Sequence, residues 1–189
     1  ISHLVREHEP DAILIAGDIT SFGPSEYVDE VAKLAKGRMM AVTGNCDTPV
    51  VAARTEAVGI NISDKVVSQG GLDVAGVAWS GEERIFDAVS QSLAARLSER
   101  DKSRPLIIIS HCPALGTLDE AEPGLHAGSQ AISDLVRSAK PVALLSGHVH
   151  GARGLVRSGG TVFVNAGPAM DGHAALVTYE KGRLDAVLL

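Results

Sequence analysis

The sequence lacks the features that mark several protein classes. It has only two cysteines among 189 residues, so it is not a small scaffold held together by disulfides. Its apolar runs fall far short of the roughly 20 residues that a membrane-spanning helix needs. Lysine and arginine form no cluster and the net charge is −6, which disfavours binding along a nucleic-acid backbone. No glycine-rich phosphate loop ending in Lys-Ser or Lys-Thr is present, so NTP-driven chemistry has no anchor.

The remaining composition is that of a globular domain. Hydrophobic residues make up 45% of the chain and charged residues 21%, which excludes intrinsic disorder. No repeat or linker interrupts the chain, so we expect a single domain over residues 1–189. We interpret Cys46 and Cys112 as reduced thiols, which predicts a cytoplasmic protein. The sequence begins with Ile1 rather than Met, which we interpret as a processed or truncated chain.

Short apolar runs alternate with amphipathic stretches along the chain. The runs are nearly continuous, which is typical of strands buried on both faces. Their alternation with helical patterns predicts βαβ units in a mixed α/β fold, to which two hairpins add antiparallel strands. The expected strands are Ala12–Ala16, Met39–Thr43, Leu106–Ser110, Val142–Ser146 and Thr161–Val164, with hairpins over Val66–Trp79 and Ala174–Leu189. The expected helices are the end of one in Ile1–Glu9, then Ser25–Lys36, Thr48–Gly59, Glu83–Arg100 and Ser129–Ala139.

Four of the apolar runs end in a small residue that is followed by a metal-binding side chain. Ligands bind at the carboxyl ends of parallel strands, and small residues there allow close approach. Carboxylates can bridge two cations, while imidazole suits Zn, Fe, Mn or Ni. Two such ions about 3.5–4 Å apart polarise a phosphate and generate a hydroxide nucleophile. The predicted metal ligands are Asp18, Asn45, His111, His148 and His150.

Taken together, these motifs resemble the calcineurin-like metallophosphoesterase superfamily. The resemblance spans nearly the whole chain and also covers the stretches 111–129 and 159–168. It implies a four-layer αββα sandwich of two mixed sheets flanked by helices. The motifs that carry it are Gly17-Asp18, Gly44-Asn45-Cys46-Asp47, Ser110-His111 and Gly147-His148-Val149-His150.

The resemblance also implies a dinuclear site with two divalent ions, either Mn, Fe, Zn or Ni. In that site Asp18 bridges both ions, and His150 helps to bind the second ion. Asn45, His111 and His148 bind the first. A metal-bound hydroxide would then hydrolyse a phosphate ester, preferably a phosphodiester.

Asn45, Asp47 and His111 are the expected catalytic residues, although Asp47 is interpreted as a capping residue more than a ligand. The expected substrate is a small phosphate ester or diester, with nucleic acid entering only as a small nucleotide. No membrane is implied, and a homo-oligomer stays open. The alternative function is a weak or inactive protein that keeps the fold as a binding module or scaffold.

The sequence departs from the family pattern at two places. The family begins with a strand that ends in Asp-x-His and completes the second metal site, and no such motif is present. Because losing a buried strand would leave its neighbours with unpaired backbone groups, we expect that strand to precede Ile1. Cys46 stands where many relatives have a histidine, and a thiol with an ordinary pKa of about 8.5 is a poorer general acid.

Three further features stay open in the sequence. His126 lies in a glycine-containing loop and either faces the substrate or lies on the surface. Trp79 is expected in the core but could line the pocket. The loops Ser80–Glu83 and Ala114–Ser129 are expected to determine substrate choice.

Overall fold

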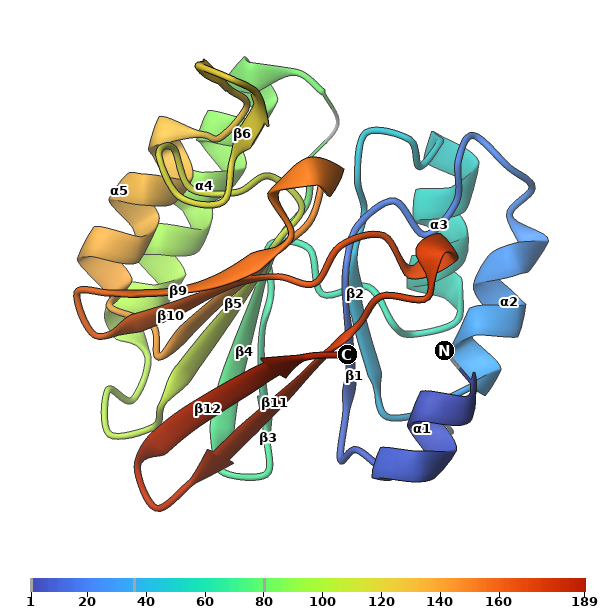
Figure 1. Ribbon diagram of the computed structural model, residues 1–189, viewed down its shortest axis with the longest axis horizontal. Helices are drawn as coiled ribbons and strands as arrows, with labels where there is room; N and C mark the ends of the chain where they lie inside the picture. The colour runs from blue at the N-terminus through green and yellow to red at the C-terminus, as the bar shows by residue number, and fades with distance from the viewer. Residues whose placement is uncertain (1, 36, 80) are drawn as a thin grey trace.

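A mixed six-stranded sheet forms the centre of the molecule (Figure 1). The computed structural model describes residues 2–35, 37–79 and 81–189, without the side chains of residues 83–89. The sheet has the order β3-β4-β5-β8-β10-β9, in which the four inner strands are parallel and both edge strands are antiparallel. Its strands are β3 (Val66–Gln69), β4 (Leu72–Val77), β5 (Leu106–Ser110), β8 (Ala143–Ser146), β9 (Gly154–Ser158) and β10 (Thr161–Asn165).

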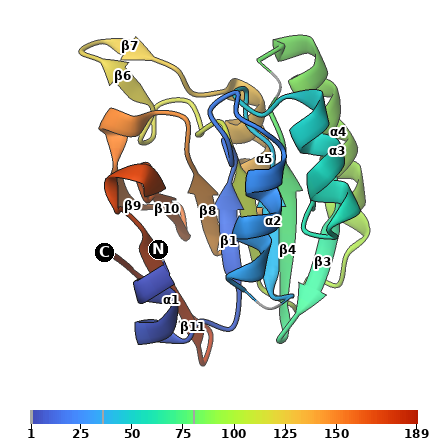
Figure 2. The same cartoon turned by 90° about the vertical axis from the view of Figure 1, so that its right-hand side faces the viewer.

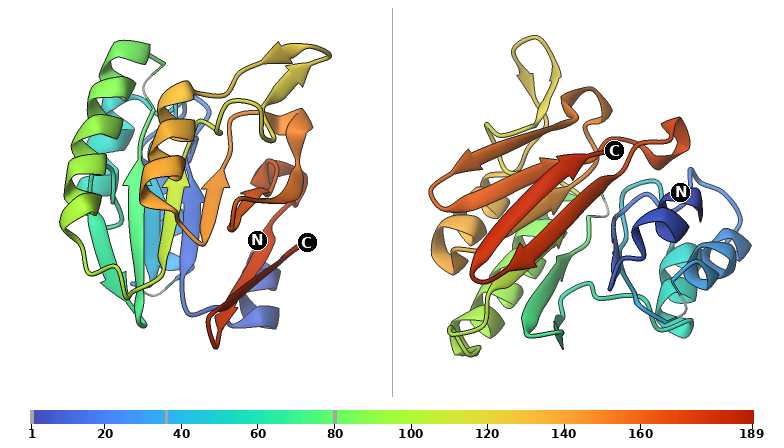
Figure 3. Two further views of the ribbon diagram at one scale, coloured as in Figure 1. Left: turned by 90° about the vertical axis from the view of Figure 1, so that its left-hand side faces the viewer. Right: turned by 60° about the horizontal axis from the view of Figure 1, so that its bottom comes forward.

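Two separate strand pairs cover one face of this sheet. The first is the parallel pair β1 (Ile13–Ala16) and β2 (Met39–Val42). The second is the hairpin β11 (Ala175–Glu180) and β12 (Arg183–Leu188), which lies against β9 and β10 (Figure 3). A small hairpin, β6 (Glu120–Glu122) and β7 (Leu125–His126), projects from the loop after β5.

Helices form the two outer layers. On the outer face of the six-stranded sheet lie α4 (Glu83–Glu99) and α5 (Gln130–Ala139). Across the molecule, α2 (Glu26–Lys33) and α3 (Pro49–Ala57) cover β1 and β2 (Figure 2). The short elements are α1 (Ser2–His8) and the 3₁₀ turns η1 (His150–Ala152) and η2 (Ala169–Asp171).

The alternation of side chains along each strand explains why the layers stack in this order. Successive side chains of a strand point to opposite faces, so one strand can serve two cores. Met39 and Ala41 of β2 pack under α2 and α3, whereas Met40 and Val42 pack toward the six-stranded sheet. Ile108 of β5 packs in the same way under the outer helices α4 and α5. Apolar runs with no polar face are therefore what this four-layer arrangement requires.

The expected fold class and the αββα sandwich are confirmed. All five expected strands form, with ends shifted by a residue at most, and both hairpins are present. The expected helix over Ser25–Lys36 ends earlier, at Lys33, and its last residue lies outside the described residues, as does Ile1. Three apolar residues of the helix over Glu83–Arg100, namely Ile85, Phe86 and Val89, have side chains outside the description.

Sequence patterns failed to predict β9 and the β6–β7 hairpin. Most residues of β9 are exposed because it forms an edge of the sheet, so the strand shows no apolar run. It pairs with β10 through the turn Gly159-Gly160, where both glycines have positive φ. The β6–β7 hairpin is exposed along both strands. Neither element contributes a buried face that a hydrophobic pattern would show.

Truncation of a central strand residue tests this description of the core. Ile108 is fully buried between the central sheet and the outer helices. We expect Ile108→Ala to lower the free energy of unfolding by about 2–5 kcal/mol, and Ile108→Val by about 0.5–1.5 kcal/mol. Val187→Ala, at a half-exposed position of β12, should stay within about 0.5 kcal/mol of the wild type. Urea denaturation measures all three, and equal losses for Ile108→Ala and Val187→Ala would contradict the layering.

Candidate metal centre

His111 lies directly after β5 with both ring nitrogens in defined contacts. Its Nδ1 is 2.8 Å from the backbone carbonyl oxygen of Ala16, at the end of β1. A carbonyl oxygen can only accept, so Nδ1 carries a hydrogen, and in the neutral form of such a ring the lone pair lies on Nε2. Nε2 is 3.0 Å from Oδ1 of Asn45 and 3.4 Å from Oδ2 of Asp18. Three acceptor atoms thus converge with no proton among them, an arrangement that a cation satisfies.

Two glycines allow these side chains to meet. A Cβ at Gly17 would lie 2.3 Å from Nδ1 of His111, and a Cβ at Gly44 would lie 2.2 Å from Oδ1 of Asp18. Asp18 itself has a φ of 48°, in the left-handed region that residues other than glycine adopt rarely. Its Oδ1 accepts a hydrogen bond from the backbone N–H of Cys46 at 2.9 Å. The carboxylate is therefore held by the loop after β2 while its Oδ2 faces His111.

His148 is placed beside His111 at the end of β8. The two rings have centroids 5.1 Å apart, and Trp79 packs edge-on against His148 at 4.3 Å. Burial, and then the neighbouring His111, lower the pKa of His148 to about 4. The ring is therefore neutral at pH 7 and has a lone pair to donate. Trp79 both packs against the core of the outer layer and contacts this candidate ligand.

Asn165 fixes the turn that carries His148. It lies at the end of β10, is buried, and its Nδ2 donates to the backbone oxygen of Val149 at 2.7 Å. Its Oδ1 accepts from the backbone N–H of Gly167 at 3.0 Å. The sequence analysis assigned no role to this residue, although it follows an expected strand just as four of the five expected ligands do. Applying the strand-end pattern to the fifth strand would have found it.

Asp47 joins the loops that carry Asp18 and Asn45. Its Oδ2 accepts from the backbone N–H groups of Ile19 and Gly44 at 3.1 and 3.0 Å. Its Oδ1 accepts from both the backbone N–H and the hydroxyl of Thr20, at 2.8 and 3.2 Å. Both carboxylate oxygens are thus engaged within the protein. Asp47 holds the loops together, and its expected part in catalysis stays a prediction.

The donor set fits one cation better than two. Asp18, Asn45 and His111 converge, His148 packs beside them, and carboxylate, amide and imidazole donors suit a divalent ion such as Mn²⁺. His150 is exposed in η1, and no hydrogen bond or ion pair joins it to Asp18 within the described residues. Across that same part of the chain, no three His, Cys, Asp or Glu side chains alone form a group that could hold a metal. The amide of Asn45 is therefore essential to the candidate centre, and the second ion stays a prediction.

Comparison with known proteins identifies the family. The family model "Calcineurin-like phosphoesterase" matches residues 1–152, most of the chain and all five predicted ligands. The chain belongs to this family. Calcineurin-like phosphoesterases are metal-dependent hydrolases of phosphate esters, and the strand ends just described lie within the matched range.

The individual proteins that this chain resembles are distant in sequence. The chain is 25% identical to the uncharacterized protein MJ1162 of Methanocaldococcus jannaschii over 177 residues, which cover 87% of this chain and 81% of that protein. The crystal structure of TT1561 of Thermus thermophilus superposes with a TM-score of 0.69 at 16% identity, covering 98% and 89% of the two chains. Phosphopantetheinyl Hydrolase of Mycobacterium tuberculosis superposes with a TM-score of 0.59 at 15% identity, covering 82% and 78%. At these identities the two solved structures show the shared fold.

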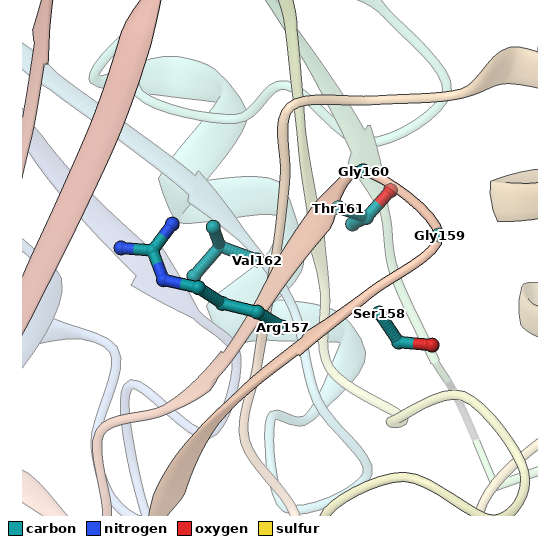
Figure 4. A pocket seen from close by; sticks show the side chains of 6 residues that line it. All are labelled: Arg157, Ser158, Gly159, Gly160, Thr161 and Val162. Carbon is teal, nitrogen blue, oxygen red and sulfur yellow. The ribbon is translucent and has the colours of Figure 1, made fainter.

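The other features of this chain lie outside the set of predicted ligands. A shallow hollow lined by Arg157–Val162 lies at the turn before β10, whereas the candidate centre lies beyond the opposite ends of the parallel strands (Figure 4). No helix of the described residues is long and apolar enough to cross a bilayer. His126 is half-exposed and paired with Asp119 in the loop between β5 and α5. The loop Ser80–Glu83 lies partly outside the described residues.

Adding one methyl group at Gly44 tests the close approach in the centre. The new Cβ would lie 2.2 Å from Oδ1 and 2.6 Å from the backbone nitrogen of Asp18, so Asp18 and the loop that carries Gly44 would have to move apart. We expect Gly44→Ala to weaken Mn²⁺ binding by about 10–100-fold, the effect typical of disturbing groups that orient metal ligands. Isothermal titration calorimetry measures this affinity.

The matched control is Gly151→Ala. A Cβ at Gly151 meets no atom within 4 Å, and its φ is not positive. This variant should bind Mn²⁺ as the wild type does, although it lies next to His150. Equal affinities for Gly44→Ala and the wild type would show that Asp18 does not take part in binding.

Proposed function

We propose that this protein is a metal-dependent phosphodiesterase. The observation that carries the proposal is the approach of Oδ2 of Asp18 and Oδ1 of Asn45 to Nε2 of His111. In a family that hydrolyses phosphate esters, such a centre binds divalent ions, which polarise the phosphoryl group and supply the nucleophile. The preference for a diester rests on the resemblance of the Gly-Asn-Cys-Asp motif to small phosphodiesterases.

Each residue of the candidate centre has a part in this proposal. Asp18, Asn45, His111 and His148 hold the first ion, and Asp18 with His150 contributes to a second ion. Ala16 keeps His111 in the tautomer whose Nε2 is free to bind. Asn165 and Asp47 hold the loops, so the ligands are arranged before the substrate arrives.

The substrate class is a small phosphate ester. Hydrolysis of a phosphate ester by a structural neighbour, the phosphopantetheinyl hydrolase, agrees with this class without naming the substrate of this chain. The competing function is a binding module or scaffold that keeps the fold and has weak or no activity. Hydrolysis of a phosphate ester in the presence of Mn²⁺ distinguishes these two functions.

Hydrolysis of bis(4-nitrophenyl) phosphate in the presence of Mn²⁺ tests the proposal. We expect metal-dependent release of 4-nitrophenolate, and Asn45→Ala should lower kcat/KM by roughly 10²–10³-fold because an electrostatic contact to the reacting centre is weakened. Asn61→Ala is the matched control, since the Asn61 side chain accepts a local backbone hydrogen bond and lies outside the centre. It should retain the wild-type rate.

The same assay decides between diester and monoester. We expect the diester to be hydrolysed faster than 4-nitrophenyl phosphate; the opposite order would refute a phosphodiesterase and leave a phosphomonoesterase. If the wild type binds Mn²⁺ but hydrolyses neither compound, the scaffold function replaces the enzyme.

A further inference from the structure

Asp119 and His126 form a second pair of ionisable side chains outside the metal centre. Asp119 is only 2% exposed, and its Oδ1 lies 2.9 Å from Nδ1 of His126. Its Oδ2 accepts from the backbone N–H groups of Gly116 and Gly128 at 2.9 and 3.3 Å. A Cβ at Gly128 would lie 2.6 Å from Oδ2, so the loop closes tightly around the carboxylate. The buried acid is thus fixed on three sides and orients the histidine.

His126 presents its other nitrogen outward. The side chain is 47% exposed, and Nε2 has no hydrogen-bond partner among the described residues. Because Nδ1 contacts a carboxylate, the protonated ring donates one hydrogen to Asp119 and holds the other on Nε2. A histidine whose one nitrogen is hydrogen-bonded to a buried carboxylate, and whose other nitrogen carries a solvent-facing hydrogen, has the geometry of a general acid.

The pair is attached to two of the segments that carry the predicted ligands. The thiol of Cys112, next to His111, lies 3.5 Å from the backbone oxygen of Ala127, next to His126. The backbone N–H of Ser129 donates to the oxygen of Pro113 at 2.9 Å, so the segment after His126 lies beside the segment after His111. These contacts hold the segment of His126 against the segment of His111.

On its other side the hairpin meets the segment that follows His148. Strand β6 packs beside η1, whose first residue is His150, and a Cβ at Gly154 would meet the side chain of Leu118 at 2.8 Å. Figure 1 shows β6 at the end of the molecule where the parallel strands end. The hairpin that carries His126 therefore lies beside the segments that carry His111 and His150.

The surroundings of His126 favour its protonated form. The hydrogen bond with Asp119 is the main cause that raises the pKa of His126, and the charges of Asp119 and Glu120 act in the same direction. Glu122 adds a further carboxylate on the hairpin, and His150 is the ionisable residue of the adjacent η1. Burial on its own would raise the pKa of Asp119, but the bonds from His126, Gly116 and Gly128 outweigh it and lower that pKa.

We propose that His126, positioned by Asp119, is the general acid that protonates the leaving group of the phosphate ester. This inference rests on the proposed function. As the oxygen of a water molecule forms its bond to phosphorus and that water releases a proton to solvent, the bond between phosphorus and the leaving oxygen breaks. The electron pair of the broken bond stays on the leaving oxygen, which takes the proton from Nε2. Neutral His126 remains and regains a proton from water before the next turnover.

Dependence of the rate on the leaving group tests this role. A general acid matters most for poor leaving groups, whose oxygen cannot leave as an anion. We expect His126→Ala to slow hydrolysis of a dialkyl phosphate by roughly 10²–10⁴-fold, and that of bis(4-nitrophenyl) phosphate by less than about 10-fold. His126→Gln, which keeps a polar side chain in the loop, should show the same selective loss.

Asp119→Asn provides a second readout that a purely structural role would not give. Without the carboxylate the pKa of His126 falls, so the basic limb of the profile of kcat/KM against pH should move to lower pH. His3→Ala, in exposed α1, is the control and should match the wild type in every assay. Melting temperatures and Mn²⁺ affinities of the variants show whether fold and metal centre are intact.

Each outcome decides one claim. If the folded His126→Gln variant keeps the leaving-group dependence of the wild type, the general-acid role is wrong while the phosphodiesterase stands. If the wild type hydrolyses no ester at all, the proposed function itself fails. A uniform loss on all substrates, with unchanged pH limbs, would make the pair structural and overturn the inference.

Discussion

The hydrogen bond from Nδ1 of His111 to the backbone oxygen of Ala16 determines how the candidate centre can work. It joins β5 of the six-stranded sheet to β1 of the facing pair, so it spans the interface between the two inner layers. It also decides which nitrogen keeps a lone pair. Without it, Nε2 could carry the proton and donate to Asn45, and the need for a cation would disappear. The same hydrogen bond therefore fixes the tautomer of His111, joins the two inner layers and orients a candidate ligand.

The loops around that bond are held in conformations that few residues tolerate. Asp18 and His148 both have positive φ, a strain that is common where function requires a particular side-chain direction. Asp47 and Asn165 compensate by hydrogen bonding to the backbone of the same loops. The rigid sheets thus present side chains from short loops, and binding does not have to order them.

Much of this arrangement follows from sequence, because its causes are local. Uninterrupted apolar runs predict doubly buried strands, and a ligand residue after each run predicts where the side chains gather, as Asp18, Asn45 and His111 show. The strand-end pattern also marks Asn165, but the pattern does not distinguish a side chain that donates to the backbone of Val149 from one that binds a metal. The pairing of Asp119 with His126 depends on a loop whose shape is set by contacts with Cys112 and Pro113. Such contacts between segments leave no periodic signal.

Anomalous diffraction from a crystal grown with Mn²⁺ tests the central claim most directly. We predict a manganese peak beside Nε2 of His111, within about 2.3 Å of that atom and in contact with Asp18 and Asn45. Nδ1 should still donate to Ala16. A bound ion found elsewhere, with Nε2 of His111 still facing the bare oxygens of Asp18 and Asn45, would contradict this prediction.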